Sequence, residues 1–491
     1  MRKASIKWML FTVLLISASL VAMWAVQFKA KYQHDVFRAD HGNKQYTGVV
    51  DENESSVIKK TLNKGKPKKT TKTNKVNPVD EVNPVDYYCN FPRDNDIFTM
   101  QEGVGQKGWK LKQVQILIRH GDRAPLNYAA YNKFRVKPNF CNIHSDYYSE
   151  KYKLVSKYRD NILKDLYTDG AVYFTHPLPQ AILCSPGQLT VFGALQQLHN
   201  GLLLREAYVQ KHKLLDAFML NETIYVRSTH VRRTYQSAVA FLYGFVPDYH
   251  FKKIPITFTN SPKFCENHCV CPKAQSIEKL VKEKQYRIYV DRQKKNSAIQ
   301  NISRIVGIGD HTGQQIDSLV TGYVCKRMPL PCNKDGECVD PSQLEVVMKE
   351  QERLNEITRL ETPAQNLALL VMQPFLENLF NQMKQVIDNK EGHKKVILYS
   401  GHDLTVTPVI QALGLPDYRW PRLGTRLVFE LWESTTGTHF IKIILNGVEV
   451  TGNTSFCPER SEDCTFEAFA NYVSNIGQVF GFESRSAACR S

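Results

Sequence analysis

The sequence predicts an α/β fold, a doubly wound mixed sheet flanked by helices with an inserted, mostly helical cap. Three short apolar runs, at 114–118, 223–226 and 394–399, have the composition of buried strands, and each ends on polar or charged side chains. Helix-like patterns separate these runs. In a doubly wound sheet the carboxyl ends of such strands meet at one edge, where ligands bind. We therefore expect one site built from three strand ends.

The first run is followed by the heptapeptide RHGDRAP, residues 119–125, in which His120 stands between Arg119 and Arg123. Two guanidinium groups can hold a phosphate through bidentate hydrogen bonds, and an imidazole can attack phosphorus as a nucleophile. Gly121 permits a tight turn and a close approach of the backbone to a ligand, while Pro125 stiffens the exit. The motif therefore indicates phosphoryl transfer through a phosphohistidine.

The second and third runs add to this chemistry. The second delivers Arg227 with Ser228 and Thr229, and the third delivers His402 and Asp403. Fixed cations stabilise a transferring phosphoryl group, and a positioned carboxylic acid is needed because a leaving alkoxide must be protonated as its bond breaks.

Together these three stretches resemble the signature of the histidine acid phosphatases. The segment GQLTVFG, residues 187–193, also resembles that family, so the similarity covers nearly everything after position 86. The resemblance implies His120 as nucleophile, Asp403 as proton donor, and Arg119, Arg123, Arg227 and His402 as phosphate ligands. It implies neither a metal nor a cofactor.

One position departs from the family pattern. His230 stands where many members carry an acidic residue, and Arg232 and Arg233 come shortly after it. Two interpretations stay open. The charges form a solvated basic surface, as charge runs commonly do, or they accommodate a larger anionic substrate.

Helical patterns fill the segments between the predicted strands. Apolar residues at helical spacing predict a helix over 188–208, and one or two helices over 344–387, with Pro363 and Pro374 as interruptions. Cysteine clusters and helical patterning at about 258–360 resemble the helical cap that members of this family insert into the sheet domain. About 400 residues come after position 86, enough for a large core.

The N-terminus predicts a membrane anchor. Residues 8–28 are 21 uncharged residues with Trp8 and Trp24 near the two ends, a length that spans a bilayer as a helix. Residues 1–7 are basic and are expected to form a cytoplasmic tail. The alternative is a cleaved signal peptide with a cleavage site near Ser17–Ser19. Either way the catalytic part enters the secretory lumen, and the anchor predicts a single-pass type II protein.

A basic stem is expected over 29–86. Its 59–75 part contains eight Lys and no acid, and the whole chain has a formal net charge of +16. A solvated, disordered spacer is the default for such a composition, and attraction to acidic glycans is the alternative. A lumenal stem meets no nucleic acid.

The cysteines also favour the secretory lumen. All twelve lie between positions 89 and 489, and an even number in an oxidising compartment predicts disulfides. Cys265, Cys269 and Cys271 lie beside His268, so zinc binding is an alternative for that cluster, although a C-x-x-C pair is lacking. Four N-glycosylation sequons begin at Asn53, Asn221, Asn301 and Asn453.

The order of anchor, stem and lumenal domain (87–491) resembles that of Golgi enzymes that modify glycans. Within the phosphatase family, the chain resembles members that act on phosphorylated xylose in the linkage region between glycosaminoglycan and protein. That resemblance implies a Golgi membrane location, and phosphoxylose on a proteoglycan linkage oligosaccharide as substrate. A broad-specificity lumenal acid phosphatase and an inactive phosphoglycan-binding protein are the alternatives.

Overall fold

The structure, a computed structural model, describes residues 83–126, 141, 149–167, 176–179, 184–215, 220–246, 254–417, 419–457 and 463–491. The expected cytoplasmic tail and membrane segment, and almost all of the stem, lie outside these ranges. Within these ranges, no helix combines the length and apolar character needed to cross a membrane.

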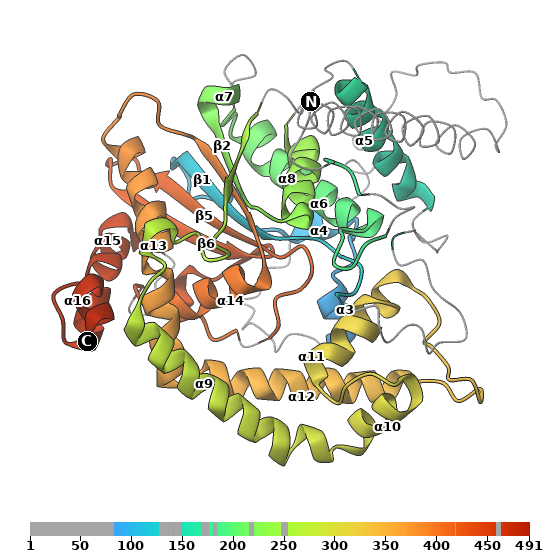
Figure 1. The fold of residues 1–491 in the computed structure, drawn as a ribbon. Coiled ribbons are helices and arrows are strands. Elements are labelled where there is room, and N and C mark those ends of the chain that lie inside the picture. The colour runs from blue at the N-terminus through green and yellow to red at the C-terminus, as the bar shows by residue number, and fades with distance from the viewer. Residues whose placement is uncertain are drawn as a thin grey trace, which may run out of the picture. The chain divides into compact units, whose positions relative to one another are not determined.

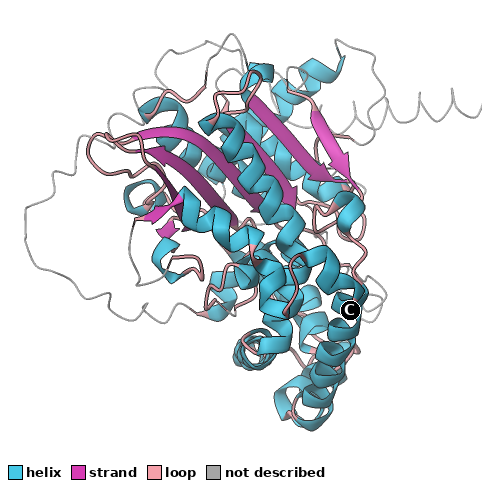
Figure 2. Cartoon of the chain, turned by 90° about the vertical axis from the view of Figure 1, so that its left-hand side faces the viewer, coloured by secondary structure: helices cyan, strands magenta, loops and turns pink. Residues whose placement is uncertain are grey.

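A mixed eight-stranded sheet forms the centre of the fold (Figures 1 and 2). The strand order is β3-β2-β4-β1-β5-β6-β7, with β8 beside β6. The first four strands in this order are parallel and the rest are antiparallel. Their bounds are β1 Lys110–Arg119, β2 Ile224–Thr229, β3 Ile256–Thr259, β4 Val396–Gly401, β5 Arg426–Glu433, β6 His439–Leu445, β7 Val448–Glu449 and β8 Cys464–Thr465. The predicted α/β class with a mixed sheet is confirmed, and the three predicted strands are β1, β2 and β4, which are adjacent.

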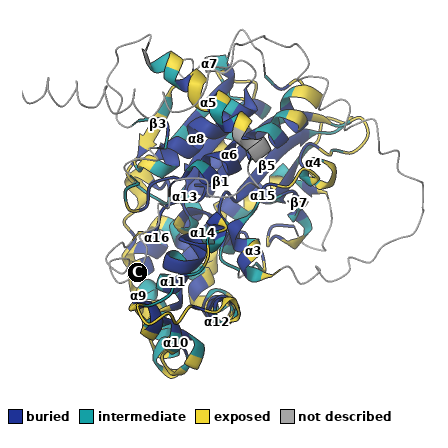
Figure 3. Cartoon of the chain, turned by 90° about the vertical axis from the view of Figure 1, so that its right-hand side faces the viewer, coloured by how far each residue is buried: buried dark blue, intermediate teal, exposed yellow. Residues whose placement is uncertain are grey.

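Helices cover both faces of the sheet because side chains alternate along each strand. In β1, Ile116 and Ile118 belong to the core shared with α6 (Val191–Leu204) and α8 (Arg232–Phe245), whereas Leu117 belongs to the opposite core. That second core contains residues of α13 (Thr362–Ile387), α14 (Asp403–Ala412) and α15 (Phe466–Ser474). Figure 3 shows β1 and α8 as mostly buried elements.

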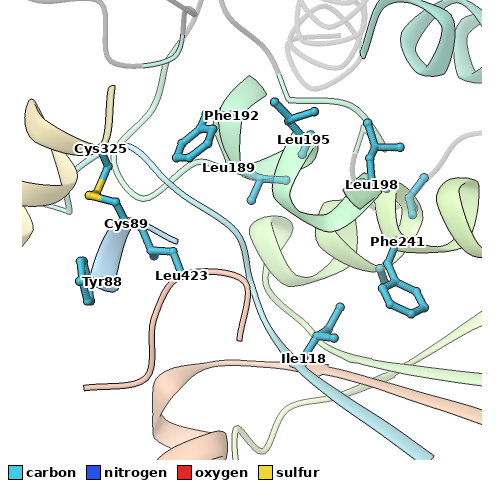
Figure 4. Close-up of a cluster of buried hydrophobic side chains, with 14 of the residues drawn as sticks. Tyr88, Cys89, Ile118, Leu189, Phe192, Leu195, Leu198, Phe241, Cys325 and Leu423 are labelled. Carbon is cyan, nitrogen blue, oxygen red and sulfur yellow. A yellow bond between two sulfur atoms is a disulfide. The ribbon is translucent and has the colours of Figure 1, made fainter. Parts of the chain in front are cut away.

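The first core reaches the turn after β1. Figure 4 shows Ile118 in one cluster with Leu198 of α6 and Phe241 of α8, and the disulfide between Cys89 and Cys325 belongs to the same cluster. The strand end that carries the RHGDRAP motif is thus held in a rigid apolar setting.

The inserted cap consists mainly of helices α9 (Pro272–Asp291), α10 (Ser297–Val306), α11 (Thr312–Gln315) and α12 (Pro341–Arg359), which lie together below the sheet in Figure 1. The cap begins later than position 258, because Phe258 belongs to edge strand β3, which pairs with β2. The remaining α-helices are α3 (Pro84–Cys89), α4 (Asp96–Thr99), α5 (Ser149–Tyr167), α7 (Leu220–Thr223) and α16 (Arg485–Arg490).

Two helix predictions need correction. The helix predicted over 188–208 is α6, but it continues as a π-helical turn, Arg205–Lys211. The predicted 344–387 segment forms α12 and α13. Pro363 lies in the first turn of α13, where its missing N–H leaves no intrahelical bond unmade. Pro374 lies inside α13 without ending it, so its prediction as an interruption is wrong. The neighbouring Phe375 and Leu376 are fully buried, and this packing stabilises the helix across the proline.

All twelve cysteines form disulfides, as predicted. The pairs are Cys89–Cys325, Cys141–Cys184, Cys265–Cys269, Cys271–Cys489, Cys332–Cys338 and Cys457–Cys464. The zinc alternative at positions 265–271 is therefore wrong, because its sulfurs are bonded to other sulfurs and are not thiolates.

Candidate active site

The carboxyl ends of β1 and β4 bring two histidines together. Arg119 and Gly401 are paired in the parallel register, and the His120 N–H donates to the Gly401 carbonyl at 3.0 Å. The rings of His120 and His402 come directly after these strands, with centroids 5.5 Å apart and planes at 71°. Both histidines are buried. The predicted meeting of these strand ends is what the structure shows.

His120 is arranged as a nucleophile. Its Nδ1 lies 2.8 Å from the carbonyl of Gly121, an acceptor, so Nδ1 carries the proton and Nε2 keeps a free lone pair. Burial, together with the positive charges of Arg233 and Arg119, lowers the pKa of His120 well below 6.5. The imidazole is therefore neutral even in mildly acidic solution.

Gly121 lets a helix approach the motif closely. A Cβ at this position would lie 2.2 Å from the carbonyl oxygen of Gly193 in α6, and one at Gly193 would lie 2.1 Å from the carbonyl oxygen of Asp122. The glycine is needed for backbone contact between the turn and α6, more than for a special turn conformation.

Arg119 is 1% exposed, and its guanidinium spans several groups of the site. Nη1 donates to the Pro421 carbonyl, and Nη2 lies 3.3 Å from the Tyr88 hydroxyl and 3.6 Å from Asp403 Oδ2. Nε is buried and has no hydrogen-bond partner among the described residues. The side chain is thus fixed, with a donor left for a ligand.

Arg123 is held by an acid of the cap. Its Nη1 forms an ion pair with Asp317 and donates to the Ala124 carbonyl at 3.2 Å. Burial alone would lower the pKa of Arg123, but the Asp317 carboxylate raises it, so the guanidinium stays charged inside the protein.

The third arginine of the cluster is Arg233 and not Arg227. Side chains alternate along β2, and Arg227 forms an ion pair with Glu266 in the segment after β3. Arg233, in the first turn of α8, has Nη2 3.4 Å from His402 Nδ1, and its charge is among those that lower the pKa of both histidines. Arg227 is nearer in sequence to the predicted strand end, but the next helix carries the arginine that reaches the site.

His402 is held as a neutral imidazole. Arg233 donates to Nδ1, so Nε2 carries the proton and donates to Thr229 Oγ1 at 2.8 Å. Burial, with Arg233 as the main charged neighbour, lowers the pKa of His402 to about 3. A neutral imidazole in this place can accept or pass on a hydrogen bond without adding charge.

Asp403, at the start of α14, faces Arg119 and an indole. The Trp420 Nε1–H donates to Oδ2 at 2.8 Å, and the Leu404 N–H lies 3.0 Å from Oδ1. Burial alone would raise the pKa of Asp403, but Arg119 and the Trp420 hydrogen bond outweigh it and lower the pKa to about 2. The carboxylate is ionised when no anion is bound.

A neutral nucleophile, two buried arginines, the partly buried Arg233 and a carboxylate around one strand edge are suited to a phosphoryl group. Residues 110–446 match the histidine phosphatase superfamily (branch 2). The chain belongs to this superfamily.

Curated relatives agree with that membership, and a solved structure agrees with the fold. The chain is 33% identical over 402 residues to "2-phosphoxylose phosphatase 1" of Xenopus tropicalis (79% of this chain, 78% of that protein) and 32% identical over 405 residues to the Homo sapiens protein of the same name (79% and 81%). It is 10% identical to the Bifidobacterium longum multiple inositol polyphosphate phosphatase complex with inositol hexasulfate, with a TM-score of 0.51, covering 82% of this chain and 99% of that one. The protein is thus a histidine-type phosphatase.

One residue of the histidine phosphatase motif, Asp122, forms a buried ion pair that the sequence analysis did not predict. Asp122 and Lys326 are 2.9 Å apart and almost fully buried, and Thr190 Oγ1 donates to the same carboxylate at 2.6 Å. Lys326 also donates to the Arg123 carbonyl at 3.2 Å. Lys326 is not near any of the three predicted strand ends in the sequence, so its contact with the motif could be seen only in the folded structure.

Two further basic residues of the phosphatase follow β2, one before α8 and one as its first residue. His230 and Arg232 are both exposed, and His230 stands edge-on to Phe258 at 5.5 Å. Of the basic residues after β2, Arg233 is the one in contact with the site. That His230 and Arg232 accommodate a larger anion stays a hypothesis.

Proposed function

We propose that this phosphatase removes the 2-phosphate of xylose in the glycosaminoglycan–protein linkage region. The observation that carries the proposal is the similarity over about four fifths of the chain to proteins named 2-phosphoxylose phosphatase 1. A neutral, buried His120 among arginines supports the phosphatase chemistry itself.

In the first step, His120 Nε2 attacks phosphorus, the bond from phosphorus to the sugar oxygen breaks, and that oxygen receives the Asp403 proton. Arg119, Arg123 and Arg233 hold the phosphoryl oxygens, and His402, predicted as a phosphate ligand, orients Arg233 through its Nδ1. In the second step, water attacks phosphorus, the bond from phosphorus to His120 Nε2 breaks, Asp403 takes the water proton, and phosphate leaves. We assign Arg227 no contact with the phosphate.

Asp403 needs a proton that it lacks in the free enzyme. Arg119, Arg123 and the Trp420 N–H hold its pKa at about 2. A bound phosphate monoester neutralises the arginines, so their effect on Asp403 weakens and its pKa rises. The acid form is therefore reached only when substrate occupies the site, and a monoanionic ester can carry the proton in.

The location is part of the proposal. Residues 8–28 form a signal-anchor that holds the enzyme in the Golgi membrane, and residues 29–86 form a stem that carries the catalytic domain in the lumen. Six disulfides in the described part support an oxidising compartment. Confocal imaging and protease protection of the full chain test this placement. If added protease cleaves the catalytic domain in sealed vesicles, the domain is not lumenal and the proposed placement is wrong.

The deciding experiment compares phosphate release from a 2-phosphoxylosyl linkage oligosaccharide with release from a simple alkyl phosphate. We expect a kcat/KM at least about 100-fold higher for the glycan than for an alkyl phosphate of similar leaving group, since remote binding contributes to catalysis. Equal values would favour the broad acid phosphatase alternative.

His120→Ala tests the nucleophile. We expect turnover to fall by more than about 10³-fold, because the covalent route is lost while the arginines still bind phosphate. Circular dichroism and phosphate binding serve as controls for folding. Appreciable activity in the folded variant would contradict the phosphohistidine intermediate.

A further inference from the structure

A cavity of about 130 Å³ is lined by residues of α4, α6, β5 and β7 and of the segments next to them. Figure 3 shows α4 and β7 on the same side of the molecule. Arg422, Arg426, Asn90 and Asn446 are among its lining residues. Asn90, Arg422 and Asn446 also line a larger groove of about 1010 Å³, so the cavity lies next to this groove. A cavity of this size holds several waters, and therefore a carboxylate or sulfate group.

Arg422 gives this cavity a positive charge that the Asp96 carboxylate, also in its lining, offsets only from a distance, without an ion pair. Its Nη2 donates to the Asn446 carbonyl at 3.3 Å, while its Nε is buried without a hydrogen-bond partner among the described residues. No described carboxylate forms an ion pair with it, and burial lowers the pKa of Arg422 to about 10. The neighbouring Arg426 has its charge compensated by Glu102, at 2.7 Å.

The carboxylates near the cavity are already occupied. Asp96 accepts from His199 and the Arg93 N–H, each at 3.2 Å, and Asp417 pairs with Arg419 at 3.0 Å. Asp96 therefore offsets the charge of Arg422 in part, but its hydrogen bonds go to His199 and the Arg93 N–H and not to Arg422.

One loop separates the cavity from the active site. Trp420 and Pro421 face the site through their hydrogen bonds to Asp403 and Arg119. Arg419 and Arg422 face the other way, over the ring of Tyr87, at 4.3 and 5.6 Å. Gly424, two residues after Arg422, donates to the His120 carbonyl at 3.1 Å. The loop from Arg419 to Gly424 therefore contacts the active site with some residues and lines the cavity with Arg422.

We propose that the Arg422 cavity binds the oxyanion of an acidic sugar in the same glycan that carries the phosphate. The inference rests on the proposed function, whose substrate it extends from one phosphorylated sugar to a charged saccharide. A uronate carboxylate and a sulfate ester share the required chemistry. The second anion increases affinity and has no part in bond cleavage.

The test uses three phosphoxylosyl oligosaccharides of equal length, which carry a uronate, a sulfated or a neutral sugar. Arg422→Gln is compared with wild type and with Arg327→Gln, an exposed arginine that likewise stacks on an aromatic ring, that of Phe91, at 4.1 Å. The assay is repeated in an Asn453→Gln background, because Asn453 of a sequon lines the groove.

We expect Arg422→Gln to raise KM about tenfold or more for one or both acidic substrates, since a charge-assisted hydrogen bond is lost. We expect kcat, the neutral substrate and the Arg327→Gln variant to stay unchanged. Comparison of the uronate and sulfate arms identifies the anion. Equal effects on all three substrates, or no effect, would overturn the proposal.

A separate binding measurement distinguishes this proposal from the proposed function. Calorimetric titration of wild type with the same uronate and sulfated oligosaccharides without phosphate tests the cavity alone. Binding that Arg422→Gln weakens supports the cavity even if no phosphoxylosyl substrate is cleaved. If neither oligosaccharide binds, and the KM values of Arg422→Gln equal those of wild type, the proposal is wrong.

Discussion

At His120 and Asp403, the same arginines act on a base and on an acid. Burial and three arginines hold the imidazole neutral, and two of those arginines help to hold the carboxyl ionised. An incoming phosphate ester reverses the balance at Asp403 by neutralising the arginines. The substrate therefore helps to create the proton donor that its own leaving group needs.

Arg233 and Arg227 form a matched pair for a test at the residue scale. We expect Arg233→Ala to lower kcat/KM about 100-fold or more, because a cation that contacts the His402 ring and the transferring group is lost. Arg227→Ala removes a half-exposed ion pair with Glu266, so we expect a change within about threefold. Kinetics on an aryl phosphate measures both. A larger loss of kcat/KM in Arg227→Ala than in Arg233→Ala would show that Arg227, and not Arg233, contacts the phosphate.

Trp420→Phe tests how Asp403 is held. The variant keeps the ring and removes the N–H that donates to Oδ2. We expect kcat on alkyl esters to fall about tenfold, with little change on aryl esters, which need no acid. The Asp403 pKa rises without this donor, so the alkaline limb of the pH profile moves upward. Trp109→Phe, at a ring stacked on Phe440, is the control. A uniform loss on both ester types would indicate a structural role only.

At the element scale, the sequence predicts the strands better than the segments after them. Apolar runs identify β1, β2 and β4 because buried parallel strands must be apolar on both faces. The position of Arg233 depends on where α8 begins, and the fate of Pro374 depends on packing around α13. Neither is local. Site residues on strand ends were therefore predictable, whereas Arg233, Trp420 and Lys326 depend on the arrangement of elements in space.

The first turn after β1 is tied to the cap by Asp122–Lys326. We expect Lys326→Met to lower the free energy of unfolding by about 3–5 kcal/mol, because it leaves the Asp122 carboxylate buried and unpaired. The double variant Asp122→Asn with Lys326→Met should recover part of that loss. Urea unfolding of the four proteins of the cycle measures the coupling. Additive effects of the two substitutions would show that the pair is not coupled.

At the scale of the whole molecule, Glu430 connects three separate parts of the chain. This carboxyl on β5 accepts from Tyr208 Oη at 2.6 Å, from the Gly103 N–H at 2.7 Å and from Trp432 Nε1 at 2.7 Å. Burial raises its pKa to about 7, although these donors oppose the rise. The π-helical turn, the segment before β1 and the sheet therefore share one titrating group.

That group predicts a pH dependence of global stability. The folded pKa of Glu430 lies above the unfolded value, so the native state holds the proton more tightly and its contribution is present below about pH 4.5 and lost as the pH rises towards 7. We expect this contribution to reach about 2–3 kcal/mol. Glu430→Gln cannot titrate, so the difference in unfolding free energy between variant and wild type should change by that amount between pH 4.5 and 7, whatever its absolute value. A constant difference across this range would show that Glu430 is ionised throughout, held by its three donors.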